Sequence, residues 1–166
     1  LDQKKSKKFI DDLKNREPNM WRYKEFLPVN YEENIVSLGE GFTPILEAKN
    51  LKNQLGIKKL LIKDESLNPT ASFKARGLSA AVSKAKELGI KKFSIPTAGN
   101  AGGALSAYAA KAGLESYVFM PNDAPLANKI EVQYFGAKLE LIDGYINDAG
   151  KKSIEIDLKN KDQSIF

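Results

Sequence analysis

Short apolar runs alternate with stretches of helical periodicity through most of the chain. Apolar runs of strand length occur at four places, 60–62, 93–95, 117–120 and 138–142. Between them, at 72–88, 101–112 and 125–136, lie stretches with apolar residues on one helical face. This pattern is typical of helices that bury one face against a core. This order predicts parallel strands joined by right-handed crossovers. We therefore expect an α/β fold with a parallel four-stranded sheet and flanking helices, and one more helix beginning near Asn147.

The first apolar run, Leu60 to Ile62, is continuous, as in a strand buried on both faces of a parallel sheet. Loops rich in polar or small residues follow the first two runs, at 64–74 and 96–103. Ligands of open parallel sheets bind beyond the carboxyl ends of the strands. These two loops are therefore the candidate functional loops.

Three regions are expected along the chain. Residues 1–44 form an N-terminal helix and an irregular aromatic segment, residues 45–150 form the α/β domain, and residues 151–166 begin a following, truncated segment. In the first region, helical spacing of apolar residues predicts an amphipathic helix within 1–16. Two glycines and a proline predict a loop over 37–44.

The composition removes several kinds of catalytic chemistry. The 166 residues include no cysteine and no histidine. Disulfide bonds, thiolate metal sites, and Ser-His-Asp or Cys-His catalysis are therefore excluded, and no metal site is predicted. Acid–base chemistry must come from lysine, aspartate, glutamate or tyrosine, or from a cofactor.

The charge balance is mild, with 26 basic residues against 21 acidic ones and a net charge of +5. This permits an anionic ligand but does not argue for nucleic acid. No apolar run approaches the ~20 residues that a membrane span needs, and no apolar signal core follows the first lysines. We expect a cytoplasmic protein that binds a small molecule, and neither nucleic acid nor a membrane.

Lys74 lies in the first candidate loop, at the predicted start of a helix. The partial positive charge of a helix N-terminus disfavours an ammonium group, so a lysine there can have a lowered pKa. A lysine that forms a Schiff base needs this property. Position alone favours the simpler interpretation, that Lys74 is one of many surface lysines.

The second loop, 97–103, consists almost entirely of small residues and opens a predicted helix. Small side chains let backbone N–H groups approach a ligand, and helix N-termini bind carboxylate or phosphate. Asn100 can donate a hydrogen bond to a ring substituent. An ordinary turn with a helix cap explains the spacing equally well.

Two segments closely resemble motifs of fold-type II pyridoxal-phosphate enzymes. Residues 68–77, Asn-Pro-Thr-Ala-Ser-Phe-Lys-Ala-Arg-Gly, resemble the lysine motif, and residues 96–102, Pro-Thr-Ala-Gly-Asn-Ala-Gly, resemble the asparagine loop. Further segments resemble the threonine synthase family, at 20–23, 27–28, 37–44 and 118–121. The resemblance covers most of the chain and implies the N-terminal part of a fold-type II enzyme.

The resemblance also implies roles for the matching residues. Lys74 would hold pyridoxal 5'-phosphate as an internal aldimine and then move protons. Asn100 would donate a hydrogen bond to the phenolic oxygen of the cofactor. The α-carboxylate of the substrate would be bound by Thr97, Gly99, Asn100, Ala101 and Gly102.

The family implies a lyase of threonine biosynthesis that converts O-phospho-L-homoserine and water to L-threonine and phosphate, and it implies a homo-oligomer. A threonine or serine dehydratase, a cysteate-synthase-like enzyme and a catalytically silent module stay open as alternatives. The family's glycine-rich loop for the cofactor phosphate has no match after Gly103. We therefore expect the chain to be the N-terminal portion of such an enzyme, inactive by itself.

Overall fold

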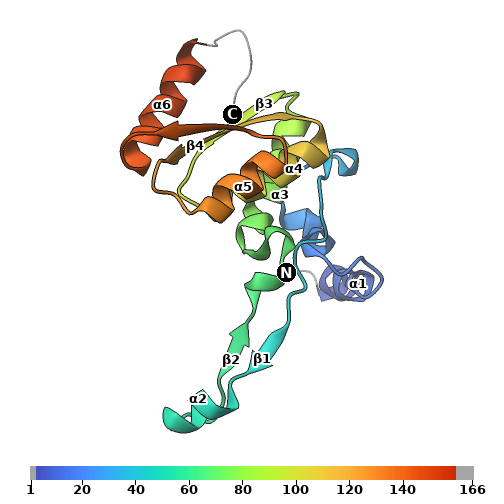
Figure 1. The fold of residues 1–166 in the computed structure, drawn as a ribbon. Helices are drawn as coiled ribbons and strands as arrows, with labels where there is room; N and C mark the ends of the chain where they lie inside the picture. Colours follow the sequence, from blue (N-terminus) through green and yellow to red (C-terminus); the bar gives the residue numbers. More distant parts are fainter. Residues whose placement is uncertain (1–2, 160–166) are drawn as a thin grey trace.

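The computed structural model describes residues 3–159. Its central feature is a three-stranded parallel sheet in the order β3-β4-β5 (Figure 1). The strands are β3 (Lys92–Pro96), β4 (Glu115–Pro121) and β5 (Lys138–Ile142). Val118 of β4 pairs with Ile95 on one side and with Leu139 on the other. The predicted α/β class and the last three predicted strands are confirmed.

Helices cover both faces of this sheet. α4 and α5 lie on one face, and α6 lies on the other, where it contacts β3 and β4 (Figure 1). α3 packs along α4. The bounds of these helices are α3 (Lys74–Glu87), α4 (Asn100–Ala112), α5 (Leu126–Tyr134) and α6 (Ile146–Lys159). All four predicted helices of this part of the chain are therefore confirmed, with ends that shift by one or two residues.

The core between α4 and the sheet is closely packed. Tyr108 of α4 and Val118 and Met120 of β4 are fully buried. Gly102 lets helix and strand approach, because a Cβ there would lie 2.7 Å from Met120 Cε and 2.9 Å from Val118 Cγ1. The first turn of α4, which begins at Asn100, is thereby held against β4.

The prediction of a buried parallel strand at 60–62 is wrong. This run forms β2 (Leu61–Lys63), which pairs antiparallel with β1 (Ile45–Glu47), an element that the sequence pattern did not indicate. The short helix α2 (Lys49–Gln54) joins the two strands. We call residues 74–159, which form the parallel sheet and its helices, the body, and residues 45–63 the arm, because Figure 1 shows the arm projecting from the body with α2 at its tip.

The two apolar side chains of β2 are far from buried. Leu61 is 47% exposed and Ile62 is 46% exposed. A three-residue run is too short for its periodicity to show whether its faces are covered, so the pattern could not distinguish an arm strand from a core strand. The parallel sheet therefore has three strands rather than four.

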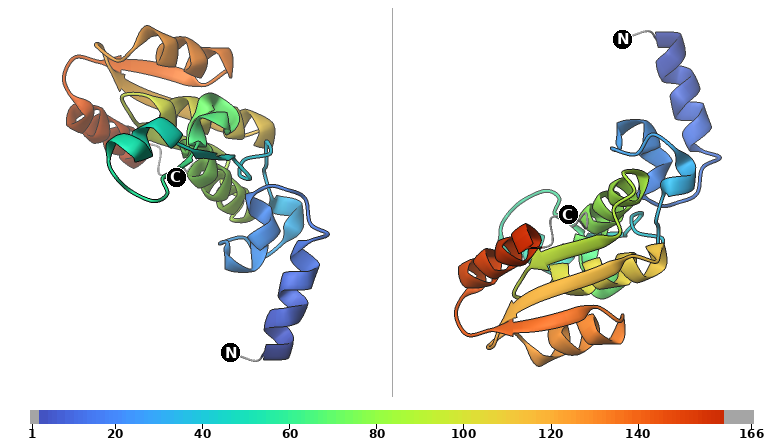
Figure 2. Two further views of the ribbon diagram at one scale, coloured as in Figure 1. Left: turned by 90° about the horizontal axis from the view of Figure 1, so that it is seen from below. Right: turned by 90° about the horizontal axis from the view of Figure 1, so that it is seen from above.

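The N-terminal region begins with α1 (Gln3–Leu13), which extends away from the body in both views of Figure 2. This confirms the amphipathic helix predicted within 1–16. Two 3-10 helices follow, η1 (Met20–Phe26) and η2 (Glu32–Asn34). The segment 37–44 contains neither helix nor strand, as predicted.

Two of the predicted regions extend beyond the described residues. The region 1–44 includes residues 1–2, and the segment 151–166 includes residues 160–166. The predicted boundary at residue 150 falls inside α6, which continues without a break to Lys159. Across residues 3–159, no helix has both the length and the apolar character that a membrane crossing requires.

A buried carboxylate connects the N-terminal region to two helices of the body. Glu40 is fully buried and accepts hydrogen bonds from the Trp21 indole at 2.9 Å and the Ser79 hydroxyl of α3 at 2.6 Å. Its other oxygen accepts from the Tyr108 hydroxyl of α4 at 2.6 Å. Burial and this hydrogen bond raise the pKa of Tyr108, which therefore stays a donor. The segment 37–44 is thus held against both α3 and α4.

Candidate active site

Lys74 is the first residue of α3 and follows two single-turn 3-10 helices, η3 (Glu65–Leu67) and η4 (Pro69–Ala71). Its backbone N–H donates to Ser72 Oγ at 3.3 Å, and its Nζ lies 3.9 Å from the centroid of the Phe73 ring. The side chain is half-buried. The structure thus places the primary amine at a helix start, as the sequence predicts, and beside an aromatic ring.

The turn before α3 has an unusual backbone. Thr70 and Ala71 adopt left-handed conformations, with φ of 59° and 51°, although neither is glycine. Such conformations cost free energy in residues with a Cβ and persist where surrounding contacts hold them. Asn68 provides such a contact, because its backbone carbonyl accepts from the Ala71 N–H at 2.9 Å. Its side chain is held in turn, since Nδ2 donates to Glu65 Oε2 at 2.9 Å and Oδ1 accepts from the Gly41 N–H at 3.0 Å.

An ion pair joins this turn to α3. Arg76 Nε lies 2.6 Å from Glu65 Oε2, and Arg76 Nη2 lies 2.8 Å from Glu65 Oε1, which is a bidentate geometry. Thr43 Oγ1 donates to the same carboxylate at 2.5 Å. The Arg76 guanidinium lowers the pKa of the Glu65 carboxyl from 4.5 to about 2. Sequence reasoning did not find this pairing, although Arg76 stands two residues after Lys74.

The second candidate loop turns sharply at the carboxyl end of β3. The Thr97 N–H donates to the Phe119 carbonyl at 2.9 Å, which continues the pairing of β3 with β4. The Gly99 N–H donates to Thr97 Oγ1 at 3.1 Å, and the Gly102 N–H donates to the Gly99 carbonyl at 2.9 Å. These two N–H groups therefore shape the turn, and Asn100, the exposed first residue of α4, follows it directly.

The structure brings the two predicted loops to one pair of packed helices. α3 packs along α4, and η4, which ends shortly before Lys74, also contacts α4. Lys74 supplies an amine that can bind an aldehyde, Asn100 exposes an amide, and the start of α4 suits a carboxylate. This set of groups fits pyridoxal phosphate and an amino-acid substrate.

Two residues of α5 reach the second loop, and sequence reasoning missed both. Asn128 Nδ2 donates to Asn100 Oδ1 at 3.2 Å. Glu131 lies against Gly103, where a Cβ would be only 2.1 Å from Glu131 Oε2. Burial raises the pKa of Glu131. The α5 sequence indicates a helix but carries no local signal of these contacts, because they depend on how α5 docks on α4.

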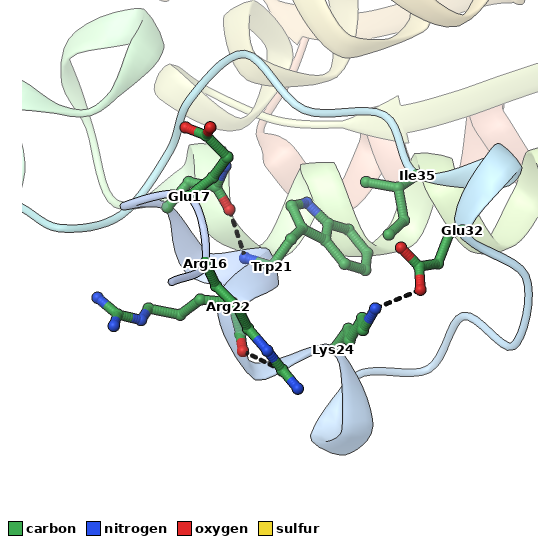
Figure 3. A pocket seen from close by; sticks show the side chains of 8 residues that line it. Arg16, Glu17, Trp21, Arg22, Lys24, Glu32 and Ile35 are labelled. Carbon is green, nitrogen blue, oxygen red and sulfur yellow. Dashed lines mark hydrogen bonds and ion pairs between the residues drawn. The ribbon is translucent and has the colours of Figure 1, made fainter. Parts of the chain in front are cut away.

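A cavity of about 260 Å³ lies in the N-terminal region, not at these loops (Figure 3). The Lys24–Glu32 ion pair and the Trp21 ring form part of its wall. Neither Lys74 nor Asn100 lines it, so this cavity is separate from the predicted site.

Comparison with known proteins identifies the family. The chain matches the pyridoxal-phosphate dependent enzyme family over residues 36–166, and it belongs to that family. The threonine synthase of Methanocaldococcus jannaschii is 40% identical over 146 residues, which cover 87% of this chain and 36% of that relative. The threonine synthase of Methanosarcina acetivorans is 39% identical over 141 residues, covering 84% of this chain and 34% of that relative. The chain therefore spans about a third of the length of these relatives.

Solved structures share the fold. Diaminopropionate ammonia lyase from Escherichia coli, in complex with an aminoacrylate-PLP azomethine reaction intermediate, has a TM-score of 0.70 at 22% identity, covering 77% of this chain and 36% of that one. A pyridoxal 5'-phosphate-dependent aspartate racemase has a TM-score of 0.68 at 24% identity, covering 75% of this chain and 39% of that one. The predicted resemblance and the predicted cofactor are confirmed at the level of the family.

Proposed function

We propose that this chain carries the lysine side of an active site that converts O-phospho-L-homoserine and water to L-threonine and phosphate. The observation that carries the proposal is that Lys74 begins α3 and Asn100 begins α4, in two helices that pack together. The threonine synthases that are 39–40% identical to most of this chain support the choice of substrate.

Each predicted residue then has a role that its position supports. Lys74 binds the aldehyde carbon of pyridoxal phosphate and moves protons at the substrate. The cofactor, when bound, withdraws electrons from the α-carbon and so makes those proton transfers possible. Asn100 donates to the ring oxygen of the cofactor. The substrate carboxylate is bound by Thr97 and the N–H groups of Asn100 and Ala101, in the turn that Gly99 and Gly102 shape.

The test is a chimera in which this chain replaces the matching residues of the Methanocaldococcus jannaschii relative. We expect it to release phosphate from O-phospho-L-homoserine and to form threonine, and borohydride reduction to leave the cofactor on Lys74. Lys74→Ala should abolish both the borohydride-fixed cofactor and the turnover. Lys111→Ala, at an exposed position of α4, should keep both. Deamination of threonine without phosphate release would overturn the proposal in favour of a dehydratase.

We also propose that the 166 residues alone do not sustain this reaction. The family's loop for the cofactor phosphate has no match after Gly103. Each hydrogen bond to a phosphate contributes about 1.5–3 kcal/mol, so the loss of several weakens cofactor binding by several decades. In the same assay, the chain alone should bind the cofactor weakly and release no phosphate.

A further inference from the structure

α5 meets the first turn of α4 at two places, one helical turn apart. Asn128 donates to Asn100, and three residues further along both helices Glu131 lies against Gly103. Residues three apart share one face of a helix, so the two contacts define one face of α5 docked on one face of α4. At Gly103 the carboxylate end of the Glu131 side chain occupies the space that a Cβ would need, since a Cβ there would lie 2.1 Å from Glu131 Oε2.

The hydrogen bond at the first of these places has a direction. Asn128 Nδ2 is the donor and Asn100 Oδ1 is the acceptor, at 3.2 Å. Asn128 also lies beside the loop backbone, since a Cβ on Gly99 would be 3.7 Å from Asn128 Oδ1. A side-chain amide has an accepting end and a donating end. When Asn128 occupies the oxygen of Asn100, the NH₂ group of Asn100 is left for another partner.

We propose that Asn128 is a positioning residue that holds the oxygen of the Asn100 amide toward α5 and so leaves the Asn100 NH₂ group for the cofactor ring. The inference rests on the proposed function, because it assumes that Asn100 contacts the ring. Asn128 acts only through Asn100. Residue 128 must therefore be a hydrogen-bond donor. Alanine at this position would let the Asn100 amide rotate, and aspartate, which only accepts, would turn the Asn100 NH₂ group toward α5.

The first measurement needs no cofactor. Side-chain amide exchange of Asn100 and Asn128 is measured by NMR in the 166-residue chain. In the unsubstituted chain, the NH₂ group of Asn128 should exchange more slowly than that of Asn100. In Asn128→Asp, the Asn100 NH₂ group should slow by about twofold or more, the ratio that a modest hydrogen bond gives. Slower exchange at Asn100 than at Asn128 in the unsubstituted chain would overturn the proposal.

The second measurement uses the chimera that carries this chain, adds pyridoxal phosphate, and records the absorbance maximum of the bound cofactor. Asn100→Ala and Asn128→Asp should shift it with the same sign and comparable size, Asn128→Ala should shift it less, and Gln133→Ala, at an exposed position of α5, should not shift it. A shift in Asn100→Ala with none in Asn128→Asp would overturn the inference. Absence of borohydride-fixed cofactor on Lys74 in the unsubstituted chimera would instead contradict the proposed function, and the exchange measurement would still decide the orientation of Asn100.

Discussion

The strands β4 and β2 contain similar apolar runs, yet the molecule uses them in opposite ways. Val118 in β4 is fully buried between two neighbouring strands, whereas Ile62 in β2 is 46% exposed and has one neighbouring strand. Helices α4 and α6 both contact β4. The arm carries only the six-residue helix α2, at its tip. The covering helices, rather than the apolar run itself, therefore determine whether a strand is buried.

The same comparison explains how the two halves of the candidate site are placed. Asn100 takes its position directly from the parallel sheet, because its loop continues from the end of β3. Lys74 follows the arm, so no strand of the parallel sheet leads into it. Its position comes from the packing of α3 along α4, together with side-chain contacts of the preceding turn, chiefly the Glu65–Arg76 ion pair and Asn68. The turn that leads into Lys74 therefore depends on polar contacts that can be removed singly.

The largest expected effect on stability comes from a substitution in the body, at the contact between α4 and β4. Gly102→Leu should lower the free energy of unfolding by about 2–3 kcal/mol, because its side chain must enter the packed contact between α4 and β4. Urea unfolding can be followed through Trp21, the chain's single tryptophan. Gly77→Leu is the matched control in α3, where a Cβ meets nothing within 4 Å and the helix gains propensity. Equal losses in the two variants would mean that α4 is not packed on β4 as described.

The next largest effect on stability is expected at the junction between the arm and the body. Glu65→Gln should cost up to about 1 kcal/mol at neutral pH, since it removes the charge partner of Arg76 at a partly exposed site. The pKa of Glu65 is lowered from 4.5 to about 2 in the folded chain, so its stabilising contribution is complete above pH 4.5 and is lost as the pH falls toward 2.

The check on this second prediction is the pH dependence of the difference between the two proteins. The stability gap between the unsubstituted chain and Glu65→Gln should narrow steadily from pH 5 downward. Glu140→Gln, at an exposed position of β5, is the matched control. A gap that stays constant over this range would show that the ion pair does not hold the lysine turn.

Much of the body was predictable from the sequence, because its signals are local. Each of β3, β4 and β5 is followed by a helix with an apolar face, and Gly113 ends α4 in the left-handed conformation, with φ of 69°. The arm was not predictable, because β1 and β2 are three residues each and their pairing joins segments on either side of α2.

The candidate site divides in the same way. Lys74 and Asn100 stand at helix starts that short-range patterns locate, so their placement was predictable. Asn128 was not, because its partner Asn100 lies on another helix, 28 residues away. Outside the site the same holds for Glu40, which meets Tyr108 68 residues further along the chain. Contacts of this kind follow from how helices dock, which no local pattern in a single sequence contains.

The smallest expected effect tests the arm itself. Ile62→Ser should lower the free energy of unfolding by no more than about 1 kcal/mol, because Ile62 is already half in solvent and loses only about half of the buried apolar area of a core isoleucine. Val118→Ser, the same kind of change in β4, should cost about 2 kcal/mol or more, since it leaves a cavity and a buried hydroxyl. Both are measured by urea unfolding at two protein concentrations.

If Ile62→Ser proved as costly as Val118→Ser at low and high concentration alike, the arm would be covered within the single chain. A cost that appeared only at high concentration would show instead that a second copy covers it. In either case burial in the folded protein would follow the apolar run after all, and the contrast between β2 and β4 would not hold.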